Sequence, residues 1–142
     1  MKDLSIAPAK AQDLPALREL YLTVRRERFF WLDPAALSLE DLDRDTAGER
    51  IWAAHRGGEL AGFLSLWEED RFVHCLYVKK EFRGLHIAGA PLKTAREAAG
   101  GPLSLKCMQA NTQALGYYLA HGWKTVEEGL CDDGPYYLMT CP

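Results

Sequence analysis

The sequence lacks several features that mark common classes of protein. Neither the dinucleotide fingerprint Gly-x-Gly-x-x-Gly nor a nucleotide-triphosphate loop ending in Gly-Lys-Ser/Thr is present. No apolar run approaches 18 residues, and the first residues, Met1-Lys2-Asp3-Leu4-Ser5, lead into a strand pattern rather than a signal peptide. The net charge of −3 gives no reason to expect a nucleic-acid partner, which would favour a basic stripe. We therefore expect a cytoplasmic protein that binds neither a membrane nor nucleic acid.

The four cysteines show no Cys-x-x-Cys pair and no Cys/His metal-ligand spacing. We therefore expect free thiols and no metal. No Ser/Gly linker, charge block or internal repeat divides the 142 residues, so the chain is expected to form a single domain over residues 1–142.

The periodicity of apolar residues predicts an α/β fold. We expect helices from a cap at Asp13, at 38–42, at about 89–98, where Pro91 fits the first turn, and from Asn111. The expected strands lie at 4–8, 50–56, 59–67, 71–78, 103–107, 124–128 and 136–140. Their order implies a mixed, mostly antiparallel central sheet of about six to seven strands, flanked by about four helices.

The segment at 71–90, RFVHCLYVKKEFRGLHIAGA, is the most informative part of the chain. An alternating apolar run passes through a charged turn into small residues and then into a predicted helix. Backbone N–H groups at such a strand-to-helix turn can point outward at the helix N-terminus, where the helix dipole stabilises an anion. The segment therefore predicts a phosphate-binding loop.

Two motifs resemble those of the GNAT superfamily of N-acetyltransferases. The loop is similar to the family's R/Q-x-x-G-x-G/A sequence, with Arg83 first, Ala88 last, and His86 where the family usually has glycine. The segment at 111–123, NTQALGYYLAHGW, resembles N-x-x-A-x-x-x-Y-x-x-x-G-F, with Trp123 in place of phenylalanine. The two motifs lie in the expected order, so the chain is identified as a member of this family.

The resemblance implies acetyl-CoA as co-substrate, without a metal. Relatives bind the coenzyme through the end of the fourth strand, the glycine-containing loop and the start of the last helix. The corresponding residues here are Leu76, Tyr77, Val78, Arg83, Gly84, Leu85, His86, Ile87, Ala88, Gly89, Ala90, Asn111, Ala114 and Tyr118. Arg83 is expected to face the phosphate, with a solvated turn residue as the alternative. Asn111 is also expected to cap its helix.

The resemblance also indicates two catalytic residues. In relatives, a tyrosine at the position of Tyr118 protonates the departing thiolate, and a strand histidine at the position of His74 deprotonates the amine through water. Imidazole titrates near neutrality and suits that task. The alternatives are a half-buried structural histidine and a tyrosine that anchors its helix, with Tyr117 as the adjacent rival. Backbone N–H groups near 76–78, freed by a strand bulge, are implicated in stabilising the oxyanion.

His86 is open to two interpretations. Its Cβ could crowd the pyrophosphate, or its imidazole could donate to phosphate. We expect a working but modified loop.

The acceptor pocket is expected at the aromatic cluster Phe29, Phe30 and Trp31 together with the acidic loop at 130–134. The acceptor is expected to be a small-molecule or peptide amine, which the sequence does not identify. The leading hypothesis is an N-acetyltransferase acting by direct transfer, as a monomer or homodimer. The alternative is a non-catalytic coenzyme A or acyl-CoA sensor.

Overall fold

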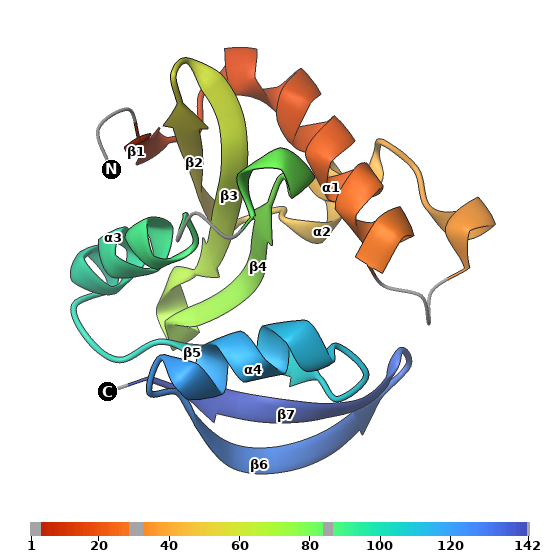
Figure 1. Ribbon diagram of the computed structural model, residues 1–142, viewed down its shortest axis with the longest axis vertical. Coiled ribbons are helices and arrows are strands. Elements are labelled where there is room, and N and C mark those ends of the chain that lie inside the picture. Colours follow the sequence, from red (N-terminus) through yellow and green to blue (C-terminus); the bar gives the residue numbers. More distant parts are fainter. Residues whose placement is uncertain (1–3, 29–32, 84–86, 142) are drawn as a thin grey trace.

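The computed structural model describes residues 4–28, 33–83 and 87–141. Its regular elements follow the predicted order closely (Figure 1). The strands are β1 (Leu4–Pro8), β2 (Arg50–Arg56), β3 (Glu59–Trp67), β4 (Phe72–Val78), β5 (Ser104–Met108), β6 (Lys124–Cys131) and β7 (Gly134–Thr140). The α-helices are α1 (Leu14–Arg28), α2 (Asp41–Asp45), α3 (Gly89–Ala99) and α4 (Thr112–Ala120).

Within the described ranges the strands form one seven-stranded sheet in the order β1-β2-β3-β4-β5-β7-β6. The pairing of β4 with β5 is parallel and the other neighbours are antiparallel. This confirms the mixed, mostly antiparallel α/β sheet that the sequence predicts.

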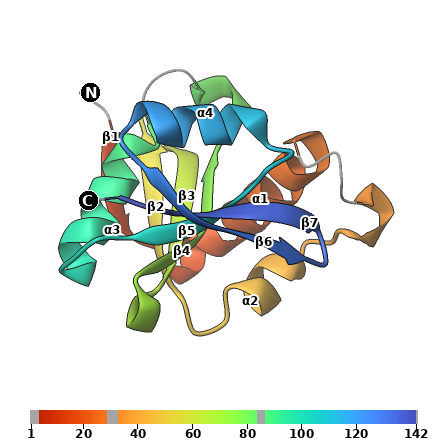
Figure 2. The same cartoon turned by 90° about the horizontal axis from the view of Figure 1, so that it is seen from below.

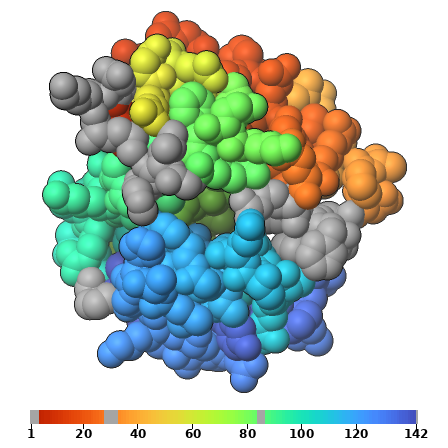
Figure 3. All heavy atoms as spheres, in the orientation of Figure 1, coloured from red at the N-terminus to blue at the C-terminus, as the bar shows by residue number. Residues whose placement is uncertain are grey.

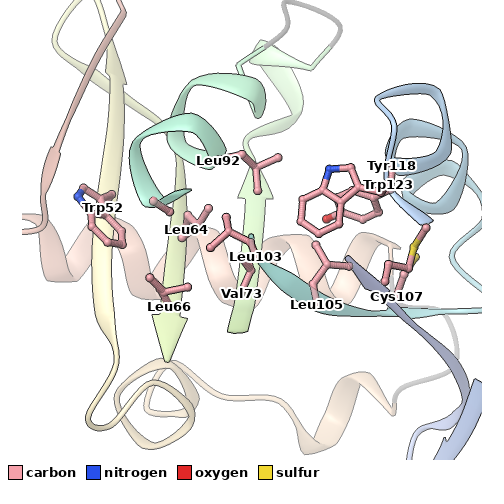
Figure 4. Close-up of a cluster of buried hydrophobic side chains, with 12 residues drawn as sticks. Trp52, Leu64, Leu66, Val73, Leu92, Leu103, Leu105, Cys107, Tyr118 and Trp123 are labelled. Atoms are coloured by element: carbon pink, nitrogen blue, oxygen red, sulfur yellow. The ribbon is translucent and has the colours of Figure 1, made fainter. Parts of the chain in front are cut away.

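Helices cover both faces of the sheet (Figures 1 and 2). On one face, α1 and α2 bury Leu17 and Leu42 against Phe63 of β3. On the other, α3 and α4 bury a larger cluster with β3, β4 and β5, which Figure 4 shows from Trp52 to Trp123. The longest helix, α1, buries Leu17, Leu20, Tyr21 and Val24 at three- and four-residue steps, as expected of an amphipathic helix on a sheet.

Turn residues define where several elements begin and end. Gly57 and Gly58 form the β2–β3 hairpin with φ of +59° and +83°, which favours glycine at both positions. Gly100 ends α3 in the left-handed region, and Asn111 Oδ1 caps α4 by accepting from Ala114 N at 3.3 Å.

Two expected details at helix starts are wrong. Asp13 does not cap α1; it lies in a short 3-10 turn (Ala11–Asp13), and its carboxylate accepts from Lys10 N at 2.8 Å. The second helix begins at Asp41 rather than Ser38. The Asp41 carboxylate accepts from both the N–H and the hydroxyl of Ser38, and this local turn competes with the helix there.

No helix in the described part of the chain has both the length and the apolar character needed to cross a bilayer.

Candidate active site

A cleft opens where β4 and β5 separate. The two strands pair only at Phe72 with Ser104 and Val73 with Leu105, and then diverge. The cleft has a volume of about 820 Å³. Figure 3 shows a recess between the green segment that contains β4 and the blue C-terminal part. Because β5 remains fully paired with β7, the divergence leaves one edge of β4 without a strand partner.

The exposed edge of β4 carries backbone donors that face the cleft. Lys79 N donates to Ala61 O at 2.7 Å, which fixes the alternation of the β3–β4 ladder. In an antiparallel ladder alternate residues point their N–H groups to opposite sides. The N–H groups of Leu76 and Val78 therefore point away from β3 towards the cleft. This is the region in which the resemblance places the oxyanion donors.

The expected strand bulge lies at His74, upstream of 76–78. Ser65 pairs with Cys75 while the next residue, Leu66, pairs with Val73, so His74 is the extra residue. The Cys75 N–H donates to the buried Ser65 Oγ at 3.1 Å. The bulge therefore turns the His74 side chain without leaving the Cys75 amide free, so that amide is no candidate for the oxyanion.

His74 lines the cleft and is hydrogen-bonded to a carboxylate. Its Nδ1 lies 2.7 Å from Oε2 of Glu49, which stands at the end of the α2–β2 connection. The histidine side chain is 38% exposed, whereas that of Glu49 is only 9% exposed. Strand alternation alone indicated the position of His74 but gave no sign of its partner.

Tyr118 lines the cleft from α4. Its ring lies 5.4 Å from that of Trp123 and belongs to the same buried cluster as Cys107 (Figure 4). Burial raises the pKa of Tyr118 well above its usual value, and the neighbouring Cys107 and Tyr117 raise it further. The hydroxyl therefore keeps its proton throughout the neutral pH range. Burial also raises the pKa of the Cys107 thiol to about 11, so this cysteine stays protonated too.

Tyr117, the rival candidate, also lines the cleft, although it projects from α4 in another direction. Its ring stacks on His121 with centroids 4.1 Å apart. A Cβ on Gly89 would lie 3.8 Å from the Tyr117 hydroxyl, so that hydroxyl reaches the start of α3. Tyr117 is therefore near the predicted phosphate end, while Tyr118 is in the aromatic core.

Most of the predicted coenzyme residues line this one cleft. They are Leu76, Tyr77, Val78, Arg83, Ile87, Ala88, Asn111, Ala114 and Tyr118. Arg83 Nε donates to Val78 O at 3.0 Å, and its Nη2 lies 3.8 Å from Glu27. Gly89 and Ala90 form the first turn of α3 and are not among the lining residues, while Gly84, Leu85 and His86 lie outside the described residues.

The lining of the cleft also has mixed charge. It includes Lys106 and Asp133 together with the apolar side chains of Val24, Phe72 and Met108. Cys131 and Asp133 belong to the acidic loop at 130–134. Phe29, Phe30 and Trp31, the other predicted acceptor residues, lie outside the described residues. The acidic loop therefore contributes side chains to the cleft, which is a condition for its predicted contact with the acceptor.

Two residues at the site escaped sequence reasoning. Glu49 carries no motif, since it is a single acidic residue before a strand and 25 positions from His74. Ser65 lies in an apolar strand as an ordinary small residue. Only the fold brings either of them to β4. Among the described residues, no group of His, Cys, Asp and Glu is arranged to hold a metal ion.

The profile of the acetyltransferase (GNAT) family matches residues 14–123, and the chain belongs to this family. Its acetyltransferase assignment agrees with a cleft between diverging strands that carries a histidine and a buried tyrosine. No curated protein shows significant sequence similarity to the chain.

Solved structures share the fold at low sequence identity. Apo YjaB from Escherichia coli has a TM-score of 0.80 at 20% identity, with 96% of each chain covered. A GCN5-related N-acetyltransferase from Rhodopseudomonas palustris has a TM-score of 0.81 at 16% identity, covering 99% of this chain and 96% of that one. Spermidine N-acetyltransferase from Vibrio cholerae, solved with CoA and spermine, has a TM-score of 0.74 at 15% identity, covering 99% and 95%.

Proposed function

We propose that the protein transfers the acetyl group of acetyl-CoA directly to an amine. The observation that carries the proposal is the cleft between β4 and β5, which His74 and Tyr118 line from a strand and a helix. An acyl transfer needs a base for the amine, donors for the carbonyl oxygen and an acid for the leaving thiolate. The cleft offers a candidate for each of these three roles.

In the proposed reaction, the amine nitrogen attacks the thioester carbonyl carbon, and the carbon–sulfur bond breaks as the amide forms. The proton of the amine passes to His74, directly or through a water. The N–H groups of Leu76 and Val78 stabilise the oxygen as it gains charge, because preformed donors need no reorganisation. Tyr118 donates its proton to the coenzyme thiolate.

We propose that the coenzyme binds the part of the cleft next to α3. Ile87 and Ala88 precede α3, an eleven-residue helix whose N-terminus suits a phosphate, and Arg83 lines the same cleft. Calorimetry should show that coenzyme A binds and that affinity falls when the nucleotide half is removed. Equal affinity for the pantetheine fragment would contradict this phosphate site. His86→Gly should weaken binding if the imidazole contacts phosphate, and preserve or improve it if the side chain intrudes.

The acceptor screen starts with two classes of amine. One similar structure is a spermidine N-acetyltransferase bound to spermine, and another is a ribosomal-protein-alanine N-acetyltransferase from Brucella melitensis. Polyamines and peptides with an N-terminal alanine are therefore assayed first, by thiol release from acetyl-CoA. Turnover of any amine would exclude the non-catalytic sensor, whereas coenzyme binding without turnover across the screen would favour it.

We also propose that the aromatic segment 29–31, which lies outside the described residues, contacts the acceptor. Asp133 supports that location because it lines the cleft from the second predicted segment. Trp31→Ala should raise the KM for the acceptor and leave acetyl-CoA affinity unchanged. An effect confined to acetyl-CoA would place the segment elsewhere.

A further inference from the structure

Glu49 is a buried carboxylate that the proposed chemistry does not yet use. Its Oε2 lies 2.7 Å from His74 Nδ1, and its side chain is about nine-tenths buried. The second oxygen, Oε1, is buried without a hydrogen-bond partner in the described part of the chain. Burying a carboxylate with half of its acceptor capacity unused is costly, so packing alone gives no reason for this residue.

The fold holds Glu49 in place through a tight turn. Thr46 Oγ1 donates to Leu42 O at 2.7 Å at the end of α2, and Glu49 N donates to Thr46 O at 2.9 Å. Between them, Gly48 has a φ of +81°, and a Cβ there would lie 3.2 Å from the Trp67 ring. This turn presents the carboxylate to β4 where the bulge places His74.

The hydrogen bond determines which imidazole nitrogen is available. An ionised carboxylate only accepts hydrogen bonds, so His74 Nδ1 must carry the proton that lies between them. In the neutral ring the lone pair is then on Nε2. Glu49 does not line the cleft, whereas His74 does. The nitrogen that remains for the amine or its water is therefore the unprotonated one, as a base requires.

We propose that Glu49 is a positioning residue that holds His74 in the Nδ1-protonated form and stabilises the imidazolium formed when the amine loses its proton. The proposal rests on His74 being the base of the proposed function. The sequence left a second interpretation open, in which His74 is a structural residue of its strand and hydrogen-bonds a neighbour. The direction of this hydrogen bond, towards a buried carboxylate and away from the cleft, favours the catalytic role.

The first test is independent of turnover. Nitrogen-15 NMR of histidine-labelled protein, with the His74 signals assigned by His74→Ala, should show a protonated Nδ1 and an unprotonated Nε2 in the neutral ring. Glu49→Ala should move population to the Nε2-protonated form. His121 is the internal control, because its Nδ1 lies 2.7 Å from Tyr117 O and should not respond. A protonated Nε2 in the parent protein would overturn the proposal.

The second test is a double-mutant cycle in the thiol-release assay. Glu49→Gln should lower kcat/KM by roughly 10- to 100-fold, a scale taken from the loss of the hydrogen-bond partners of metal-binding histidines. In a His74→Ala background the same change should have no further effect, because Glu49 acts only through His74. Glu59→Gln is the matched control, since it removes a carboxylate from an exposed pair with Lys79. Equal losses in both backgrounds would overturn the proposal.

The His74 spectrum separates positioning from packing. A lower melting temperature of the Glu49 variants with an unchanged His74 spectrum would assign Glu49 to packing and overturn the proposal.

The outcomes also separate this inference from the proposed function. Suppose that the His74→Ala variant has the activity of the parent protein, while NMR shows that the Nδ1-protonated form of His74 depends on Glu49. His74 is then not the base, but Glu49 still positions its imidazole. If His74→Ala is impaired and Glu49→Gln is not, the base assignment stands and the role of Glu49 fails. Should Glu49→Ala fail to fold, Glu49→Leu carries the NMR test, because it fills a similar volume and cannot accept a hydrogen bond from Nδ1.

Discussion

At the scale of single residues, Tyr118 and Tyr117 differ in burial although they are neighbours in α4. Tyr118 is 8% exposed and packs on Trp123, whereas Tyr117 stacks on His121 nearer the surface. Desolvation keeps the Tyr118 hydroxyl protonated, and the same dry surroundings would strengthen its hydrogen bond to a developing thiolate. Its position and its protonation state both suit an acid.

Removing the Tyr118 hydroxyl should therefore impair turnover selectively. Tyr118→Phe keeps the ring packing, so acetyl-CoA affinity measured by calorimetry should hold. kcat should fall by about 100- to 10,000-fold, the range typical for loss of a positioned acid. Steady-state kinetics by thiol release gives the measurement.

Tyr117→Phe is the matched control for this prediction, because it removes the same group from the adjacent residue of α4. It should leave kcat near that of the parent protein. If Tyr117→Phe were the impaired variant, the acid would be Tyr117, and the buried tyrosine would be a structural anchor of its helix.

At the scale of elements, β4 combines several tasks within seven residues. It pairs with β3 along its whole length but with β5 only at its start. The bulge places His74 beside Glu49, and the unpaired edge downstream presents backbone donors. A close approach between β3 and β4 supports that edge: a Cβ on Gly62 would lie 2.5 Å from Tyr77 O and 3.3 Å from the Cα of Val78.

Gly62→Ala should therefore disturb the site through the backbone. The added methyl group has to push β4 away from β3, which should lower the free energy of unfolding by about 1–3 kcal/mol. It should also weaken acetyl-CoA binding, because Val78 lies on the displaced edge. Denaturant unfolding and calorimetry measure the two effects.

Gly116→Ala is the control for the Gly62 substitution. Gly116 lies inside α4, and a Cβ there would meet nothing within 4 Å. The substitution should raise the free energy of unfolding by about 0.5–1 kcal/mol through helix propensity alone. An unchanged stability of Gly62→Ala would mean that β3 and β4 adapt without strain, and the supporting role of Gly62 would be wrong.

At the scale of the whole molecule, a charge cluster centred on the buried Asp41 joins α2 to α1. Asp41 is 2% exposed and lies 3.1 Å from Arg25 and 2.9 Å from Arg44. Burial alone would raise the pKa of Asp41, but the hydrogen bonds from Ser38 and Arg25 outweigh it and hold the pKa below its usual value. The cluster therefore makes global stability depend on pH.

The sign of that dependence follows from the lowered pKa. The folded protein prefers the ionised Asp41, so its contribution is present above the ordinary aspartate pKa of about 3.9 and is lost as the pH falls through the lower folded value. Asp41→Asn should be less stable than the parent at pH 7, and the difference should shrink as the pH falls below about 4. Urea unfolding at several pH values measures it.

Asp43→Asn provides the comparison, because Asp43 forms an exposed pair with Arg18 at 2.8 Å. Its smaller effect on stability should fade in high salt, whereas that of Asp41→Asn should persist. A constant difference between the parent and Asp41→Asn from pH 7 to pH 2 would contradict the role given to the Asp41 charge.

The sequence by itself determined the order and type of the elements and the family motifs. Apolar periodicity depends on local geometry, so the strands and helices could be located to within a few residues, as could the inward face of α4 with Tyr118. Turns that need special residues, such as Gly57-Gly58 and the Asn111 cap, were equally readable. Strand alternation on β4 also placed His74 beside the coenzyme residues.

The features of the site that depend on contacts between residues distant in the chain were decided by the tertiary structure alone. The bulge at His74 is defined by how β4 pairs with β3. The hydroxyl of Ser65, ten positions before Cys75 in the chain, accepts the hydrogen bond of the Cys75 amide beside the bulge. Glu49 reaches His74 only because the α2–β2 turn lies beside β4 in the folded chain. No local pattern encodes such a contact, since the interaction is specified by packing between elements and not by the periodicity within one of them.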